Sequence, residues 1–180
     1  MVVIRSFPSA IYVDTSVVVA AILEDALHHT GARTFCNQLI ENRSRVCFSQ
    51  LLRLELAQAI RVYGTVSAAL PVTVRRRYRL ARWDRDHEVR ARWYHDGVTA
   101  FEALLADLSR VYEIPIRVED WRSSIALMSR YHLRSYDAFH AATALGLGVF
   151  NFATLDSDFT RVSELNIHLL RDVSPLPEQS

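Results

Sequence analysis

Four acidic residues occupy places where the surrounding sequence predicts apolar packing. Asp14 ends the short apolar run "AIYVD", and Asp156 ends a second run, "VFNFATLD". Glu55 lies among leucines in "LLRLELA", and Asp137 shares a helical face with small apolar residues in "SYDAFHAATAL". Taken singly, each acid has an ordinary explanation as a helix cap, a solvated helix residue or a first-turn acid that favours the helix dipole. Together they indicate a shared site.

We expect these four acids to converge at one edge of a sheet. In parallel α/β folds, ligands bind outside the carboxyl ends of the strands, where Asp14 and Asp156 are predicted to lie. Glu55 and Asp137 fall in the N-terminal halves of helices, which right-handed connections bring to the same edge. Converging carboxylates repel one another and raise one another's pKa. A hard divalent cation relieves that repulsion, so the pattern predicts a site for Mg²⁺ or Mn²⁺ that can assist attack on a phosphodiester.

Other catalytic chemistries find little support in the sequence. It contains no GxSxG, HExxH, CxxC or Walker A motif. A phosphotransfer enzyme with an aspartyl nucleophile of the DxD type would need an acid two residues after Asp14, where Ser16 stands. All 21 basic residues are arginine, so no mechanism here can use a lysine.

Strands and helices alternate along the chain. The runs at 10–14, 45–49, 114–118, 149–156 and 166–170 have the length and composition of short buried strands. Amphipathic helices are predicted between them, with Thr15 or Ser16 as the cap of the first and Ser135 as the cap of the helix that carries Asp137. The helix that carries Glu55 is expected to stop at Gly64. This alternation predicts an α/β sandwich around a parallel sheet.

Length and composition favour one domain. We assign residues 1–175 of the 180 to it, with 65–107 as a helical insertion and 176–180 as a loose tail. A net charge of +1 gives no overall excess of the kind typical of nucleic-acid binding. Cys36 and Cys47 lack metal-ligand spacing and are expected to be core residues in a reducing compartment. The sequence shows no signal peptide or membrane span, so we expect a cytoplasmic protein.

Four short motifs in order resemble one known family. "YVDTS", "SQLLRLELAQA", "SYDAFHAATAL" and "FATLDSDF" resemble the motifs of PIN-domain ribonucleases, in particular the VapC-type toxins of bacterial toxin–antitoxin pairs. The resemblance covers nearly the whole chain. It implies a PIN-like three-layer α/β/α sandwich with a central parallel sheet and, in this longer chain, a helical protrusion. It also implies a Mg²⁺- or Mn²⁺-dependent endoribonuclease that cuts RNA, pairs as a homodimer and is silenced by a cognate antitoxin protein.

Carried over position by position, the resemblance assigns roles to particular residues. The acids matching the family's catalytic and metal-binding quartet are Asp14, Glu55, Asp137 and Asp156, and Asp158 matches an additional acid that some members use. Thr15, Ser16 and Thr154 match polar residues that orient the acids. His140 is interpreted as a structural residue rather than a ligand.

An arginine-rich segment lies in the expected insertion. "VRRRYRLARW" contains Arg75, Arg76, Arg77 and Arg79 beside aromatic residues, a composition that can follow an RNA backbone and stack on bases. A solvated helix packed by arginine stems has the same composition and is the favoured reading. Two other functions stay open: a non-catalytic PIN-like module that binds RNA or a partner, and a structure-specific DNA nuclease. The four retained acids argue against the first, and the short chain makes RNA the better substrate than DNA.

Overall fold

The chain folds around one parallel sheet of five strands. The computed structural model describes residues 7–24, 26–66 and 87–170. Along the sheet the strand order is β3-β2-β1-β4-β5, and every neighbouring pair is parallel. The strands are β1 (Ala10–Val13), β2 (Arg45–Ser49), β3 (Val111–Ile114), β4 (Asn151–Thr154) and β5 (Asn166–Leu169).

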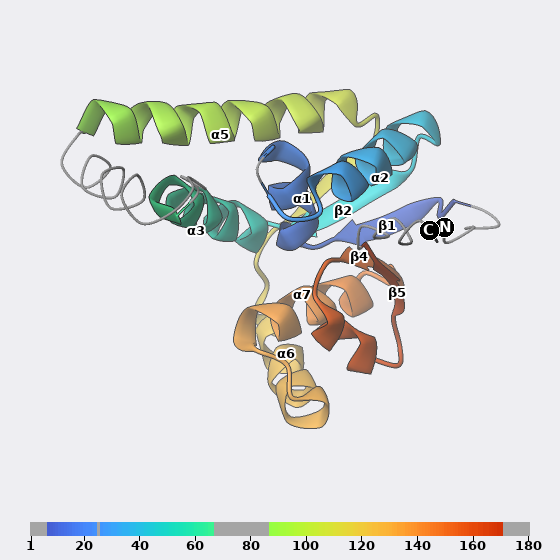
Figure 1. Ribbon diagram of the computed structural model, residues 1–180. Helices are drawn as coiled ribbons and strands as arrows, with labels where there is room; N and C mark the ends of the chain where they lie inside the picture. Colours follow the sequence, from blue (N-terminus) through green and yellow to red (C-terminus); the bar gives the residue numbers. More distant parts are fainter. Residues whose placement is uncertain (1–6, 25, 67–86, 171–180) are drawn as a thin grey trace, which may run out of the picture.

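Helices cover both faces of this sheet (Figure 1). The helices are α1 (Thr15–Ile22), α2 (His29–Glu41), α3 (Leu51–Val66), α5 (His87–Asp107), α6 (Val118–Tyr131) and α7 (Ser135–Gly146), with a short 3-10 helix η1 at Ser157–Arg161. One face carries α1, α2, α3 and α5, and the other carries α6, α7 and η1. The predicted three-layer α/β/α sandwich with a central parallel sheet is therefore confirmed.

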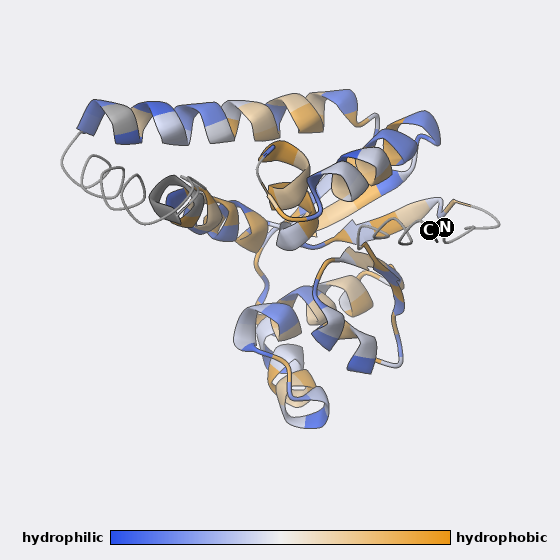
Figure 2. Cartoon of the chain, viewed as in Figure 1, coloured by the Kyte–Doolittle hydropathy of each residue, from blue (hydrophilic) through white to orange (hydrophobic). Residues whose placement is uncertain are grey.

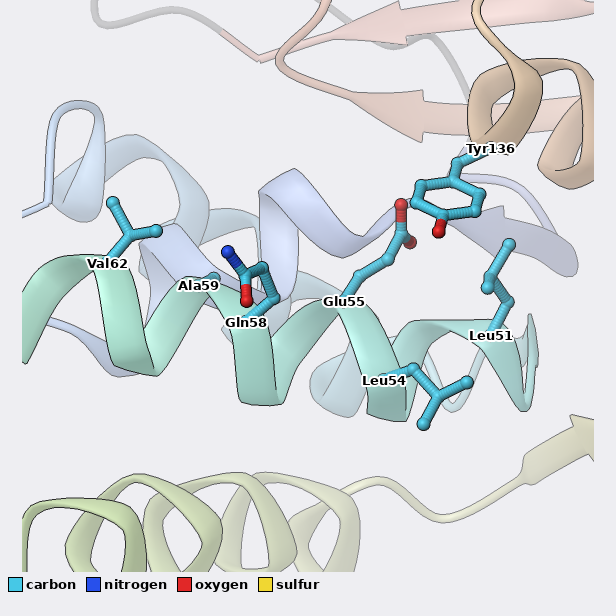
Figure 3. Close-up of a pocket in the computed structure, with 7 residues that line it drawn as sticks. All are labelled: Leu51, Leu54, Glu55, Gln58, Ala59, Val62 and Tyr136. Atoms are coloured by element: carbon cyan, nitrogen blue, oxygen red, sulfur yellow. The ribbon is translucent and has the colours of Figure 1, made fainter. Parts of the chain in front are cut away.

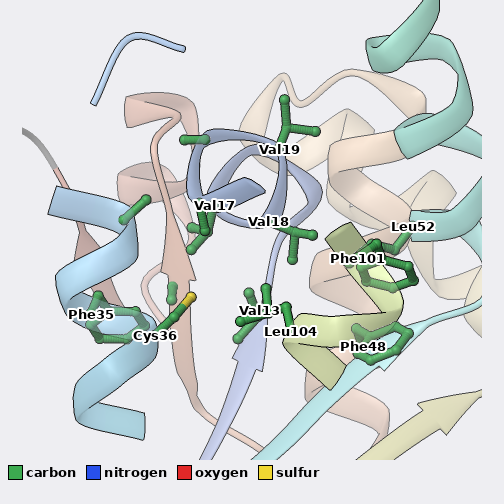
Figure 4. Close-up of a cluster of buried hydrophobic side chains, with 14 of the residues drawn as sticks. Val13, Val17, Val18, Val19, Phe35, Cys36, Phe48, Leu52, Phe101 and Leu104 are labelled. Carbon is green, nitrogen blue, oxygen red and sulfur yellow. The ribbon is translucent and has the colours of Figure 1, made fainter. Parts of the chain in front are cut away.

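The position of β1 at the centre of the sheet explains why its sequence is a continuous apolar run. Ile11 and Val13 point into the core beneath α1, α2, α3 and α5, whereas Tyr12 between them points into the core beneath α7. Successive side chains of a strand alternate between faces, so a strand with helices on both sides needs apolar residues at every position. Figure 4 shows how Val17 and Val18 of α1 pack over the sheet, and Figure 2 shows hydrophobic residues gathered on β1, β2 and α1.

The long helix α5 lies against α3, and both extend beyond the sheet (Figure 1). Their close approach depends on Gly97, where an added Cβ would lie 2.6 Å from the Ile60 Cδ1 atom. Trp93 fixes the same pair of helices by donating from its indole nitrogen to the Ile60 carbonyl at 2.7 Å. Of this pair, α5 falls within the helical insertion expected at 65–107, whereas nearly all of α3 precedes it. The arginine-rich stretch 74–83, including Arg75, Arg76, Arg77 and Arg79, lies outside the described residues.

Several predicted boundaries are wrong. Asp14, rather than Thr15 or Ser16, occupies the N-cap position of α1, and Arg134 rather than Ser135 occupies that of α7. The helix α3 continues past Gly64 to Val66. The third strand begins earlier than expected, at 111 instead of 114, because pairing with β2 sets its register.

Both cysteines are buried in the structure. Cys36 and Cys47 are free and buried, as expected of small core residues, and burial raises the pKa of the Cys36 thiol to about 11. Within the described ranges, no helix combines the length and apolar character that crossing a membrane requires.

Candidate active site

Asp14 stands directly after β1, at the carboxyl edge of the sheet. Its backbone nitrogen donates to the Ala153 carbonyl on β4 at 3.0 Å, which ties it to the neighbouring strand. Its carboxylate is buried, with the residue 6% exposed, and Oδ2 accepts hydrogen bonds from two hydroxyls. These come from Ser16 at 2.5 Å and Thr154 at 2.9 Å. The two hydroxyls compensate the buried charge and fix the direction of the carboxylate.

Glu55 projects from the second turn of α3 toward α1 and α7. Its Oε2 accepts from the Thr15 hydroxyl at 2.5 Å and faces His140 Nε2 at 2.6 Å. Burial acts to raise the pKa of Glu55, but the hydrogen bonds from His140 and Thr15 outweigh burial, and the net pKa lies below its usual range. Glu55 is therefore held as a carboxylate in a fixed orientation.

His140 supports Glu55 from inside the core. The ring is fully buried, and its Nδ1 lies 2.8 Å from the Tyr12 hydroxyl, which accepts from the Ser49 backbone nitrogen at 3.1 Å. Burial by itself lowers the pKa of His140, but the hydrogen bond to Glu55 and the charge of Asp14 outweigh it and raise the pKa. Sequence reasoning gave His140 no partner and overlooked Tyr12. The only sequence signal was a polar ring placed three residues after Asp137 and a tyrosine inside a buried strand.

Asp137 is the least satisfied acid of the group. It lies in the first turn of α7, and its Oδ2 is buried with no hydrogen-bond partner among the described residues. Burial, as the largest cause, and the charges of Asp14, Asp156 and Glu55 together raise the pKa of Asp137 to about 6. The four carboxylates therefore lie near enough to repel one another at this edge of the sheet.

Asp156 and Asp158 have different surroundings. Strand β4 ends at Thr154, so Asp156 follows the strand by two residues and occupies the N-cap position of η1, with Oδ1 accepting from the Asp158 backbone nitrogen at 2.8 Å. Its own nitrogen donates to the Thr154 hydroxyl at 3.0 Å. The carboxylate of Asp158 instead pairs with the Arg161 guanidinium at 2.7 Å. Asp156 is one of the acids whose charge raises the pKa of Asp137.

The donor set matches a hard divalent cation in chemistry, although its side chains are not arranged as a finished cage. Among the described residues, no three histidine, cysteine or acidic side chains are positioned to hold a metal ion. Two of the carboxylates turn toward hydroxyl groups instead, as the bonds to Asp14 and Glu55 show. The buried, unpartnered Oδ2 of Asp137 nevertheless suits an oxygen ligand for such a cation. Carboxylate oxygens are the ligands that Mg²⁺ and Mn²⁺ prefer.

A pocket of about 550 Å³ opens beside these acids (Figure 3). Residues of one side of α3 line it together with Tyr136, the residue before Asp137. Glu55 belongs both to the pocket wall and to the acidic group, and Figure 3 shows its carboxylate extending toward the Tyr136 ring. The sequence offered no sign of this pocket, because its walls come from two helices far apart in the chain.

Comparison with known proteins agrees with this architecture. The family model of the PIN domain matches residues 11–165. None of the curated proteins matches the sequence. A crystal structure of VapBC2 from Rickettsia felis, bound to a DNA fragment from their promoter, has a TM-score of 0.58 at 13% identity, covering 89% of this chain and 98% of that one. VapC20 from Mycobacterium tuberculosis, described as a sarcin–ricin loop cleaving toxin, has a TM-score of 0.54 at 16% identity, covering 85% of this chain and 95% of that one.

The family match spans both clusters of the core and every acid of the quartet, from β1 to the end of η1. The chain belongs to the PIN domain family.

Proposed function

We propose that this chain is a metal-dependent endoribonuclease that hydrolyses phosphodiester bonds in RNA, and that it is the toxin of a toxin–antitoxin pair. Asp14, Glu55, Asp137 and Asp156 are the catalytic acids, and Mg²⁺ or Mn²⁺ is the cofactor. Asp158 takes a lesser part, because its carboxylate is already engaged by Arg161.

The unpartnered carboxylate of Asp137 carries this proposal. A buried carboxylate oxygen without a hydrogen bond is costly, and three further acids in range make it more so. Strongly perturbed pKa values are concentrated at functional sites, so this arrangement indicates a functional role for Asp137. For a purely structural role, an asparagine or an apolar residue at this position would avoid the free-energy cost of burying a carboxylate.

The polar residues around the acids orient them for this function. Ser16 and Thr154 both donate to Oδ2 of Asp14, and Thr15 and His140 both contact Oε2 of Glu55. A bound divalent cation would be held by the four acids, and it would activate a water molecule and stabilise the charge that develops on the phosphate. With its raised pKa, Asp137 keeps a proton on its carboxyl group up to about pH 6, and a bound cation would compete with that proton.

The choice of RNA and of a toxin rests on the structural neighbours. Both carry Vap names, and VapC20 is described as cleaving the sarcin–ricin loop. On that basis we propose a cognate antitoxin protein as partner, a homodimer as the assembled form and the cytoplasm as the site of action. We also propose that residues 1–175 form a single domain with 65–107 as its insertion and 176–180 as a tail.

A cleavage assay on partner-free protein tests the proposal. Wild type and Asp137→Asn are incubated with labelled RNA in EDTA, Mg²⁺ or Mn²⁺, and Asp107→Asn, at an exposed position at the end of α5, serves as the matched control. We expect wild type and Asp107→Asn to cut with either metal but not in EDTA, and Asp137→Asn to be inactive throughout. Cleavage of DNA instead of RNA, or equal cleavage by Asp137→Asn, would contradict the proposal.

A further inference from the structure

The pocket beside Glu55 has the character of a site for a flat, partly apolar group. Tyr136 is 58% exposed, and Leu54 on the facing helix is 65% exposed. Leu51 and Val62 extend the apolar wall along α3. A volume of about 550 Å³ lies within the range of small-ligand pockets, about 300–1,000 Å³.

Besides Glu55, one amide side chain interrupts this apolar wall among the residues that line it. Gln58 lies on α3 three residues after Glu55 and lines the pocket from the same helix face. Its amide offers both donors and an acceptor, which is the combination that recognises the edge of a nucleobase. An aromatic ring and an amide around an apolar space provide stacking and edge recognition together.

The position of the pocket indicates which kind of group it binds. This inference rests on the proposed function, in which a scissile phosphate must lie at Glu55 and Asp137. The pocket begins at Glu55, and Tyr136 directly precedes Asp137 on α7. A base attached to the nucleotide at the cleavage point therefore lies within reach of the pocket, whereas a paired base, stacked within a duplex, does not expose its face.

We propose that this pocket receives an unpaired nucleobase next to the scissile phosphate, with Tyr136 stacking on the base and Gln58 contacting its edge. Tyr136 then makes the enzyme select single-stranded RNA, and Gln58 influences which base is accepted. Neither side chain takes part in the chemical step.

Steady-state cleavage of a single-stranded RNA of ten nucleotides tests the role of Tyr136. Base–aromatic stacking is worth about 1–3 kcal/mol, and the exposed ring places this site in the lower part of that range. We expect Tyr136→Leu to raise KM about 5- to 30-fold with kcat unchanged, and Tyr136→Phe to behave as wild type. Tyr112→Leu, at a partly exposed tyrosine on the edge strand β3, is the matched control and should leave KM unchanged. Gln58→Leu should alter the relative KM values of adenosine-rich and uridine-rich strands.

A spectroscopic measurement separates stacking from a structural effect. In the Asp14→Asn background, which keeps the RNA intact, 2-aminopurine placed at the cleavage position should lose fluorescence on binding, and Tyr136→Leu should abolish this loss. Equal KM values for Tyr136→Leu and wild type, or an equal effect of Tyr136→Leu on a strand with an abasic site at that position, would overturn the inference while leaving the nuclease intact. Unchanged RNA kinetics with weaker binding of a partner protein would overturn it in favour of a protein-docking pocket. A wild type that cuts no RNA would refute the proposed function, and the inference with it.

Discussion

Replacing Asp137 by asparagine should stabilise the metal-free protein. The asparagine keeps the shape of the side chain and removes a charge that lies near three other acids. A carboxyl group whose pKa is raised on folding binds its proton more tightly in the folded state than in the unfolded chain. The wild type therefore loses stability relative to the variant as pH rises from the unfolded pKa, 3.8, through the folded pKa, about 6.

The size of this effect follows from the shift in pKa. A shift from 3.8 to about 6, at about 1.4 kcal/mol per unit, corresponds to about 3 kcal/mol above pH 7. Because Asp137 is partly open to solvent, water screens these charges, and we expect about 1–2 kcal/mol. For a chain of this length, that gain raises the melting temperature by about 2–8 °C. By linkage, about two thirds of the difference develops between pH 4.5 and 7.5.

Thermal unfolding in EDTA measures the effect directly. Melting temperatures of wild type and Asp137→Asn are compared at pH 4.5, 6.0 and 7.5, with Asp107→Asn as the control for loss of an exposed charge. The gain of Asp137→Asn should grow with pH, and added Mg²⁺ or Mn²⁺ should stabilise wild type but not the variant. A difference that does not change with pH would refute the reasoning, since the asparagine would then act through packing rather than charge.

Three further predictions test the core and the site. Gly97→Ala should destabilise the fold by about 1–3 kcal/mol in urea unfolding, because its Cβ would lie 2.6 Å from Ile60 Cδ1. Adding Ile60→Val should recover part of this loss, and additive effects of the two substitutions on the free energy of unfolding would argue against the contact. Tyr12→Phe should lower the free energy of unfolding by about 1–3 kcal/mol, since it leaves two buried partners without their hydrogen bonds, and an unchanged value would show that water replaces the hydroxyl. Asp156→Asn should reduce RNA cleavage about 10- to 100-fold and Asp158→Asn much less, as measured by initial rates; the opposite order would make Asp158 the fourth acid.

The amino-acid sequence is sufficient to predict the layered fold and to identify the acids of the candidate site. Apolar runs such as 10–13 must be strands buried on both faces, and alternating helices then require a parallel sheet. Acids at the ends of such runs indicate a functional site, because burying a charge costs free energy unless a partner compensates it. This inference requires only the local sequence. Helix boundaries are harder to predict, since a glycine such as Gly64 lowers helix propensity without necessarily ending the helix, and α3 continues to Val66.

The contacts that hold these acids depend on how distant parts of the chain pack together. The Glu55–His140–Tyr12 chain joins α3, α7 and β1, and no periodicity along the sequence predicts contacts between residues that are 85 and 128 positions apart. The same holds for the pocket between α3 and Tyr136, and for the different surroundings of Asp156 and its neighbour two residues on. A side chain's partners and its pKa depend on which surfaces the fold brings together. The residue types at the site are written in the sequence, and their orientation and charge state arise from packing.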